Sequence, residues 1–224
     1  TGPIKFNFKK IEEKVIFNIF ESKLNTVKMM EALLKKALKA GIKRLNDITV
    51  EEVLENNSLV KIKTDQFEFS SKKLLIDTNG FASQLGLESV KPARAQVIIT
   101  KPIENLQIKG TFHLEKGYYY FRNIDNRILL GGGRNLDLKT EETTSLGETA
   151  LIQNKLESLL RETILPNTDF EIDRRWSGIM GVGIQKKPIV RKLSNNTCCG
   201  VRLGGMGVAI GSLVGRELAD LIPN

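Results

Sequence analysis

The stretch Thr197–Ile222, TCCGVRLGGMGVAIGSLVGRELADLI, carries the strongest pattern in the chain. Its apolar run from Cys198 to Leu203 is typical of a buried strand. Three glycines follow within four residues, Gly204, Gly205 and Gly207. Apolar residues at helical spacing then continue almost to the last residue. A strand, a glycine turn and a helix in this order predict a surface that faces a ligand. The helix N-terminus offers unpaired N–H groups, and glycines let a ligand approach the backbone closely.

The spacing Gly205-x-Gly207-x-x-x-Gly211 is close to the dinucleotide-binding fingerprint, but its last gap is one residue too long. The fingerprint also needs an acidic residue about 20 positions further on, and this sequence ends before that position. A helix that packs closely on a strand through small residues explains the same glycines. The stretch alone therefore leaves both interpretations open.

The composition bounds the remaining possibilities. A chain of 224 residues with 41% hydrophobic residues is typical of one large or two small globular domains. No apolar run approaches the roughly 18 residues of a membrane span, and the net charge of +8 is scattered along the chain. This favours a solvated basic surface over nucleic-acid binding, which needs a basic stripe or a basic-aromatic platform. The adjacent cysteines Cys198 and Cys199 indicate buried thiols and a cytoplasmic location, and the single His113 cannot anchor a histidine-rich metal site.

The order of periodic segments predicts a mixed α/β fold. Alternating apolar residues predict two short strands within residues 4–20, and Asn25 or Thr26 can cap a helix that ends near Gly41. A second helix is expected over 146–164, ended by Pro166. Strands are expected at 59–63, from 67, and at 72–79, 97–100, 112–121, 127–130 and 170–172.

Five motifs, in the same order, resemble the D-amino-acid oxidase and glycine oxidase superfamily of FAD-dependent oxidoreductases. They are the strand end Leu74–Gly80, the segment Pro92–Gln96, the strands Gly117–Arg122 and Arg127–Gly132, the Trp176-Ser177-Gly178 sequence with a later Pro188, and the closing turn Gly205–Ala209. Val50 resembles, more faintly, a valine whose backbone meets the adenine in that family. This last resemblance has an ordinary buried valine as its simpler explanation.

The resemblance implies a set of site residues. Those expected to bind the cofactor are Val50, Thr78, Asn79, Gly80, Trp176, Gly178, Gly205, Met206, Gly207, Val208 and Ala209. Those expected to line the substrate side are Tyr118, Tyr120 and Arg122, which would share one face of an alternating strand. The tyrosines could equally pack the core of their domain. No catalytic side chain is implied, because a neutral amine needs no strict base.

Three departures from the family pattern stand out. The Gly-x-Gly-x-x-Gly strand-turn-helix that holds the ADP half of FAD is not found in the sequence, which predicts a fragment of a longer protein that binds FAD poorly alone. Ile179-Met180 stands where relatives often have Leu-Arg, whose arginine binds the substrate carboxylate. No cysteine matches the flavin-tethering cysteine of some sarcosine oxidases, so non-covalent FAD is expected.

The resemblance implies two interleaved domains: an FAD domain from 25–86 and 166–224, and a substrate domain from 1–24 and 87–165. It implies the oxidation of a C–N bond in an amino acid or related amine by hydride transfer to FAD. Two rivals remain at this point: a non-catalytic binding protein with the same fold, and a basic RNA-binding domain. The substrate, the electron acceptor and the oligomeric state are left open.

Overall fold

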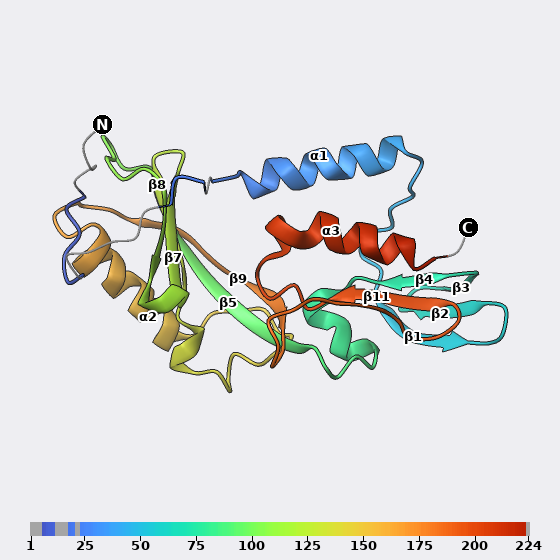
Figure 1. Cartoon of the computed structure of the whole chain (residues 1–224). Coiled ribbons are helices and arrows are strands. Elements are labelled where there is room, and N and C mark those ends of the chain that lie inside the picture. Colours follow the sequence, from blue (N-terminus) through green and yellow to red (C-terminus); the bar gives the residue numbers. More distant parts are fainter. Residues whose placement is uncertain (1–5, 12–17, 21–22, 223–224) are drawn as a thin grey trace. The chain divides into compact units, whose positions relative to one another are not determined.

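The computed structural model describes residues 6–11, 18–20 and 23–222, which form two compact units (Figure 1). Unit 1 comprises Thr1–Lys23 and Arg94–Ile179, and unit 2 comprises Leu24–Ala93 and Met180–Asn224. The chain therefore passes between the units three times, and the second and third crossings fall inside strands. The sequence placed these crossings after residues 24, 86 and 165. The third differs most, because residues 172–179 pair into the sheet of unit 1.

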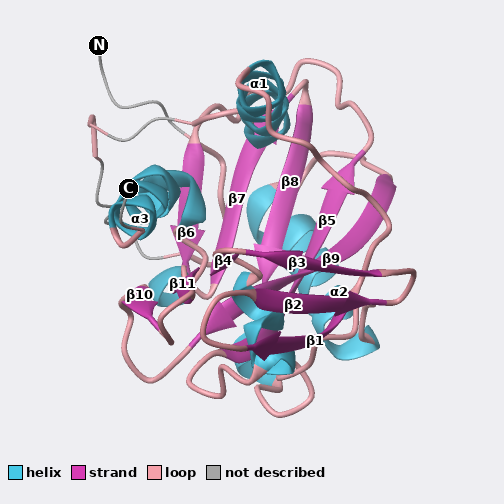
Figure 2. Ribbon diagram, turned by 90° about the vertical axis from the view of Figure 1, so that its right-hand side faces the viewer, coloured by secondary structure: helices cyan, strands magenta, loops and turns pink. Residues whose placement is uncertain are grey.

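Unit 1 is built on one five-stranded sheet, whose strands lie side by side in Figure 2 in the order β6-β7-β8-β5-β9. In chain order the strands are β5 (Lys91–Thr100), β6 (Thr111–Leu114), β7 (Tyr119–Ile124), β8 (Arg127–Gly132) and β9 (Ile172–Val182). The pairs β6–β7, β7–β8 and β5–β8 are antiparallel. Short 3-10 turns, Glu115–Gly117 and Arg134–Leu136, precede β7 and follow β8.

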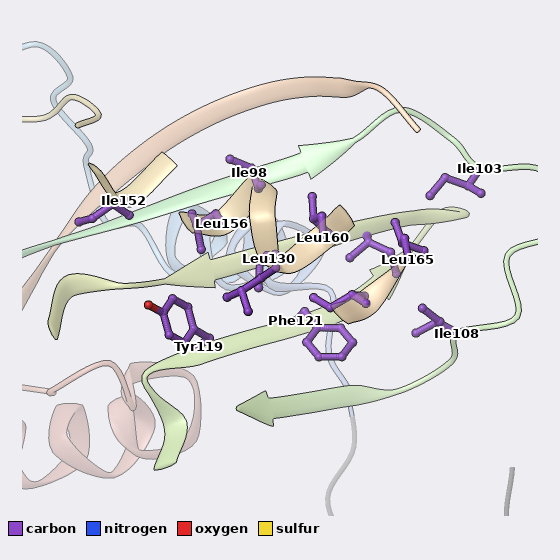
Figure 3. Close-up of a cluster of buried hydrophobic side chains, with 13 residues drawn as sticks. Ile98, Ile103, Ile108, Tyr119, Phe121, Leu130, Ile152, Leu156, Leu160 and Leu165 are labelled. Carbon is purple, nitrogen blue, oxygen red and sulfur yellow. The ribbon is translucent and has the colours of Figure 1, made fainter. Parts of the chain in front are cut away.

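One face of this sheet is covered by helix α2 (Ala150–Leu159), which continues as a π-helical turn, Leu160–Ile164. The core lies between them and joins Ile152, Leu156 and Leu160 to the sheet side chains Ile98, Tyr119, Phe121 and Leu130 (Figure 3). Each such fully buried aliphatic side chain stabilises the fold by roughly 1.5–3 kcal/mol. The helix ends where expected, because Pro166 cannot continue it.

The two strands expected within residues 4–20 fall partly outside the described residues, and the described residues 6–11 and 18–20 contain no strand. Phe6 and Phe8 instead pack on the core of unit 1, with ring centroids 5.0 Å and 5.4 Å from that of Phe112. The alternation of Phe6 and Phe8 therefore reflects the packing of their rings on the core, and residues 6–11 form no β-strand.

Unit 2 contains two small sheets. In the first, β1 (Val50–Glu55), β2 (Val60–Thr64) and β3 (Glu68–Ser71) form an antiparallel meander. In the second, β11 (Thr197–Val201) lies in the middle, antiparallel to β10 (Ile189–Lys192) and parallel to β4 (Leu74–Ile76). Every residue of β11 is buried, as expected of the central strand in a sheet covered by other elements.

Three helical elements complete unit 2: α1 (Thr26–Lys39), a 3-10 helix Asn79–Leu85 after β4, and α3 (Gly207–Asp220) after β11. Helix α1 begins and ends as its sequence predicts. Asn25 Oδ1 accepts a hydrogen bond from the Lys28 N–H. Gly41 adopts φ +87°, so that the N–H of Ile42 reaches the carbonyl of Ala37. Among the described residues, no helix is long and apolar enough to cross a membrane.

Candidate functional site

Three segments of unit 2 meet at Asn79, which lies three residues after the last residue of β4. Asn79 adopts φ +44°, and its Oδ1 accepts a hydrogen bond of 3.0 Å from the N–H of Leu203, beyond β11. Gly181, at the end of β9, lies directly against Asn79: a Cβ atom there would stand 2.6 Å from Asn79 Oδ1. The carbonyl of Gly181 accepts a hydrogen bond from the Gly204 N–H at 2.9 Å. Asn79 and Gly181 together fix where the turn after β11 begins.

That turn has a backbone that only glycine adopts without strain at two positions. Gly204 and Gly205 have φ +59° and +82°, and the N–H of Met206 closes the turn on the carbonyl of Leu203. Gly205 also lies against Met180, whose Sδ would be 3.2 Å from a Cβ at position 205. The turn therefore delivers the chain into α3 with no side chain at Gly204 or Gly205.

The first turn of α3 is open to a ligand. Met206 is the N-cap residue and makes no side-chain cap, and no acidic residue lies in the first turn. The N–H groups of Gly207 and Val208 cannot have partners within their own helix, and the side chains of Met206 and Val208 are about half exposed. These donors and the helix dipole favour an electron-rich group at this position.

Gly207 itself is not required by the fold. Its φ is not in the left-handed region, and an added Cβ would meet only Leu203 Cδ1, at 3.3 Å. A small shift of that flexible side chain makes room. The predicted need for glycine at position 207 therefore depends on a bound ligand.

The structure brings together most of the predicted cofactor-binding residues of unit 2. Thr78, Asn79 and Gly80 lie at or next to the junction with Leu203, and Gly205, Met206, Gly207, Val208 and Ala209 form the turn and the start of α3. Val50 lies elsewhere, as the first residue of β1 in the other sheet. Trp176 and Gly178 lie in the part of β9 that belongs to unit 1.

Asp77, directly before this junction, has a perturbed carboxyl group. A Cβ atom on Gly200 would stand only 2.8 Å from Asp77 Oδ1 and 3.0 Å from Leu218 Cδ2 of α3. The absence of a side chain at Gly200 thus lets the carboxylate and the helix approach the sheet. Burial raises the pKa of the Asp77 carboxyl.

Sequence reasoning missed two residues at the junction, Gly181 and Arg202. Gly181 follows the Trp176-Ser177-Gly178 motif by three residues, and only the contact with Asn79 reveals its role. Arg202 has φ +65°, unusual for arginine, and its Nε donates to the carbonyl of Lys187 at 2.8 Å. Its side chain lies over Gly183, where a Cβ would be 2.7 Å from Arg202 Cδ. No sequence signal predicted this conformation.

In unit 1, the sheet face opposite to α2 carries the predicted substrate-side residues Tyr120 and Arg122. Tyr119 and Phe121 point into the core, so Tyr120 and Arg122 point the other way. Across the sheet, Tyr120 is paired with His113 and with Gly131. A Cβ on Gly131 would stand 2.6 Å from the Tyr120 hydroxyl, so the ring lies over this glycine. Burial raises the pKa of the Tyr120 phenol.

Tyr118 does not belong to this alternating strand. It ends the 3-10 turn Glu115–Gly117 with helical backbone angles, and its carbonyl accepts a hydrogen bond from the Gly133 N–H. Left-handed residues at Lys116 and Gly117 break the strand that the three consecutive tyrosines predicted. Its side chain is half exposed.

A buried ion pair stands on the α2 side of the same sheet. Glu141 accepts hydrogen bonds from Arg94 Nε at 2.9 Å and Nη2 at 2.8 Å, and from Gln96 Nε2 at 3.0 Å. Gln96 in turn accepts from the Thr149 N–H and from Gln153 Nε2. The Pro92–Gln96 motif thus anchors the loop that leads to α2, and this loop is joined to β9 by a hydrogen bond from the Gly147 N–H to Ser177 Oγ.

Comparison with known protein families places the chain. Residues 16–221 match the model of the DAO family, described as FAD dependent oxidoreductase, and the chain belongs to this family. The expected family is therefore confirmed, and the mixed α/β architecture agrees with it.

Individual relatives are distant and about twice as long. The chain is 22% identical over 218 residues to a protein of Haemophilus influenzae described as "Probable oxidoreductase OrdL", covering 92% of this chain and 49% of the relative. Its fold is similar to L-proline dehydrogenase from P. horikoshii, with a TM-score of 0.71, 20% identity and coverage of 87% and 54% of the two chains. It is also similar to glycine oxidase from Geobacillus kaustophilus, with a TM-score of 0.72, 20% identity and coverage of 85% and 52%. At these identities the likeness to solved structures shows the fold alone.

Proposed function

We propose that this chain is part of a flavin-dependent oxidoreductase that oxidises a C–N bond of an amino acid or related amine. The observation that carries the proposal is the junction of Asn79, Gly181 and the Leu203–Gly205 turn, which positions an uncapped helix N-terminus in a member of an FAD-dependent family. Several proteins of similar structure, among them a glycine oxidase, a proline dehydrogenase and an iminodiacetate oxidase, are named for substrates of the same class.

The residues at the junction fit the flavin of FAD. The free N–H groups of Gly207 and Val208 and the positive end of α3 suit the flavin pyrimidine edge, where negative charge develops on reduction. The left-handed Gly204 and Gly205 present bare backbone to a flat ring. When bound, FAD supplies the acceptor for a hydride from the substrate carbon, so that the amine is oxidised to an imine. We propose that Val50, Trp176 and Gly178 also contact the bound FAD.

On the substrate side, the sheet face of unit 1 opposite to α2 supplies polar and aromatic groups. Tyr120 offers a phenol whose pKa is raised by burial, and Arg122 offers a cation on the same face. Because Met180 stands where relatives often have a carboxylate-binding arginine, we propose that Arg122 binds the substrate carboxylate. Tyr118 is a weaker member of this set, since it lies outside the strand.

We further propose that FAD is bound non-covalently, that the protein is cytoplasmic, and that this chain alone is inactive. Cys198 and Cys199 are both free thiols buried in β11, which suits a reducing compartment and removes them as flavin tethers. The chain spans about half the length of its relatives, and we expect the ADP-binding motif in the other half.

The proposal is tested on the natural polypeptide that contains this chain. A yellow preparation should release FAD on denaturation, and a panel of D- and L-amino acids, N-substituted glycines and simple amines should include a compound that bleaches the flavin under anaerobic conditions. A flavin-free protein would contradict the cofactor assignment. A flavin that no amine reduces, although dithionite does, would contradict the substrate class.

A further inference from the structure

Gln153, on the buried side of helix α2, makes hydrogen bonds through both ends of its amide. Its Oε1 accepts from Arg175 Nη1 at 2.7 Å, and its Nε2 donates to Gln96 Oε1 at 3.1 Å. Gln153 is 6% exposed and Gln96 is fully buried. Gln96 Nε2 in turn donates to Glu141 Oε1 at 3.0 Å. A polarised chain of hydrogen bonds therefore runs from the Arg175 guanidinium to the Glu141 carboxylate, and the bonds of such a chain strengthen one another in a low-dielectric interior.

This chain of hydrogen bonds joins β5 to β9 through α2, and these are the two strands in which the protein passes between its units. The Gln96 amide at its centre is fully paired, because Thr149 donates its N–H to the amide oxygen and accepts from the amide nitrogen through Oγ1. A satisfied buried network holds its members in one arrangement, since any displacement leaves a buried polar group without a partner. The network therefore fixes Arg175 of β9 against α2.

Trp176 stands between two residues of β9 that are both anchored on the α2 side of the sheet. Arg175 is held by the network and also forms an ion pair with Glu157 of α2. Ser177 Oγ accepts a hydrogen bond of 2.8 Å from the N–H of Gly147, in the loop that leads to α2. Neighbouring side chains of a strand point to opposite faces. The Trp176 ring therefore projects from the face opposite to α2.

Burial alone would not set this orientation. Strand β9 is the last in the sheet order and has one neighbour, β5, among the described residues. Residues 173–176 are all exposed, so they lack the alternation of buried and exposed side chains that normally assigns each residue of a strand to a face. The anchors at Arg175 and Ser177 supply this constraint instead.

We propose that Gln153 is a positioning residue of the candidate site: it holds Arg175 on the α2 side and thereby directs the Trp176 ring to the face that carries Tyr120 and Arg122. Gln153 acts through Arg175, and a bound ligand need not touch it. The proposal rests on the proposed function, in which Trp176 contacts FAD.

The test uses the natural polypeptide that contains this chain, labelled with fluorotryptophan, and observes Trp176 by fluorine NMR. The resonance of Trp176 is identified as the one that Trp176→Phe removes. Gln153→Met keeps an unbranched side chain that favours a helix but removes both hydrogen bonds. We expect this variant to displace the Trp176 resonance by more than its linewidth. Titration of the flavin-free protein should show a Kd for FAD that is about 10-fold higher.

Thr100→Val is the matched control, because it removes another buried hydrogen bond of unit 1, from the Ile128 N–H to Thr100 Oγ1, at the last residue of β5. It should lower the urea midpoint about as much as Gln153→Met does, and it should leave the Trp176 resonance and the Kd for FAD unchanged. Arg175→Met should reproduce the effect of Gln153→Met, and the double variant should show no further displacement of the resonance.

An unchanged Trp176 resonance in Gln153→Met, or an equal displacement in Thr100→Val, would overturn the proposal. Effects of Gln153→Met and Arg175→Met that add in the double variant would also overturn it, as would a displaced resonance with an unchanged Kd for FAD. A wild-type protein that binds no FAD would contradict the proposed function instead, and the fluorine NMR comparison would still decide whether Gln153 positions Trp176.

Discussion

The ion pair between Arg94 and Glu141 allows a quantitative test of how unit 1 is held together. The Glu141 side chain is fully buried and that of Arg94 is 10% exposed, and the carboxylate accepts three hydrogen bonds. Glu141→Gln keeps the size of the side chain but removes the charge and turns an amide NH₂ toward donors. Breaking one side of a buried ion pair typically costs roughly 3–5 kcal/mol, because it leaves an uncompensated charge.

A loss of this size is a large part of the roughly 5–15 kcal/mol that stabilises a typical domain. Urea unfolding followed by tryptophan fluorescence measures it, because Trp176 is the single tryptophan of the sequence and lies in the part of β9 that belongs to unit 1. The control is Glu171→Gln, which breaks an exposed ion pair with Lys101. The side chains of Glu171 and Lys101 are 72% and 56% exposed, respectively. That change should cost at most about 1 kcal/mol.

The double variant Arg94→Met with Glu141→Gln removes both charges. We expect it to be more stable than the sum of the two single changes predicts, because the unpaired charge is gone. Strict additivity, or a cost of Glu141→Gln no larger than that of Glu171→Gln, would refute the inference that this pair anchors the loop before α2.

Three further predictions concern the site and its surroundings. Arg122→Lys in the full-length protein should lower kcat/KM by about one to two decades and more than Arg127→Lys, because Arg127 lies next to the turn, at the start of β8; equal kinetics for the two variants would remove Arg122 from the site. Asp77→Asn should raise the melting temperature at neutral pH. Because the folded-state pKa of Asp77 is raised, the stability that this carboxyl contributes is present below its unfolded pKa of about 3.9 and is lost as the pH rises through the folded value. The increase in melting temperature should therefore vanish near pH 3. An increase that persists at pH 3 would argue against burial of the Asp77 carboxylate as its cause. The 224-residue chain alone should bind FAD poorly or not at all, since much of the affinity resides in the ADP half; tight stoichiometric binding in isothermal titration calorimetry would show otherwise.

The sequence predicted the elements whose signals are local. Helix α1 begins at the Asn25 cap and ends at Gly41, because both residues act through their immediate neighbours. Tyr118 was misplaced for the opposite reason: three tyrosines favour a strand, but the left-handed backbone at Lys116 and Gly117 interrupts it. The apolar side chains Val27, Met30, Leu33 and Leu38 of α1 are exposed, and the exposure of a helix face depends on what packs against it, which no local pattern encodes.

In the candidate site, too, the sequence predicted the local features and missed the contacts between distant segments. The closing turn at Gly204 and Gly205 could be predicted, because glycines at a strand-to-helix junction have a specific backbone use. The contacts that place the turn, from Asn79 to Leu203 and from Gly181 to Gly204, join segments far apart in the chain. Likewise, Arg94 and Glu141 are 47 residues apart. Such pairs carry no periodicity or spacing that a single sequence could reveal.

The central claim is that the start of α3 faces the flavin, and the most direct measurement is the FAD content of two glycine variants of the full-length protein. Gly207 and Gly211 lie one turn apart on α3. An added Cβ at position 207 meets only a flexible side chain, and one at position 211 meets nothing within 4 Å. Gly207→Val and Gly211→Val should therefore both fold. We predict that the first is purified without FAD and the second with full FAD content; full FAD content in Gly207→Val would contradict the placement of the cofactor.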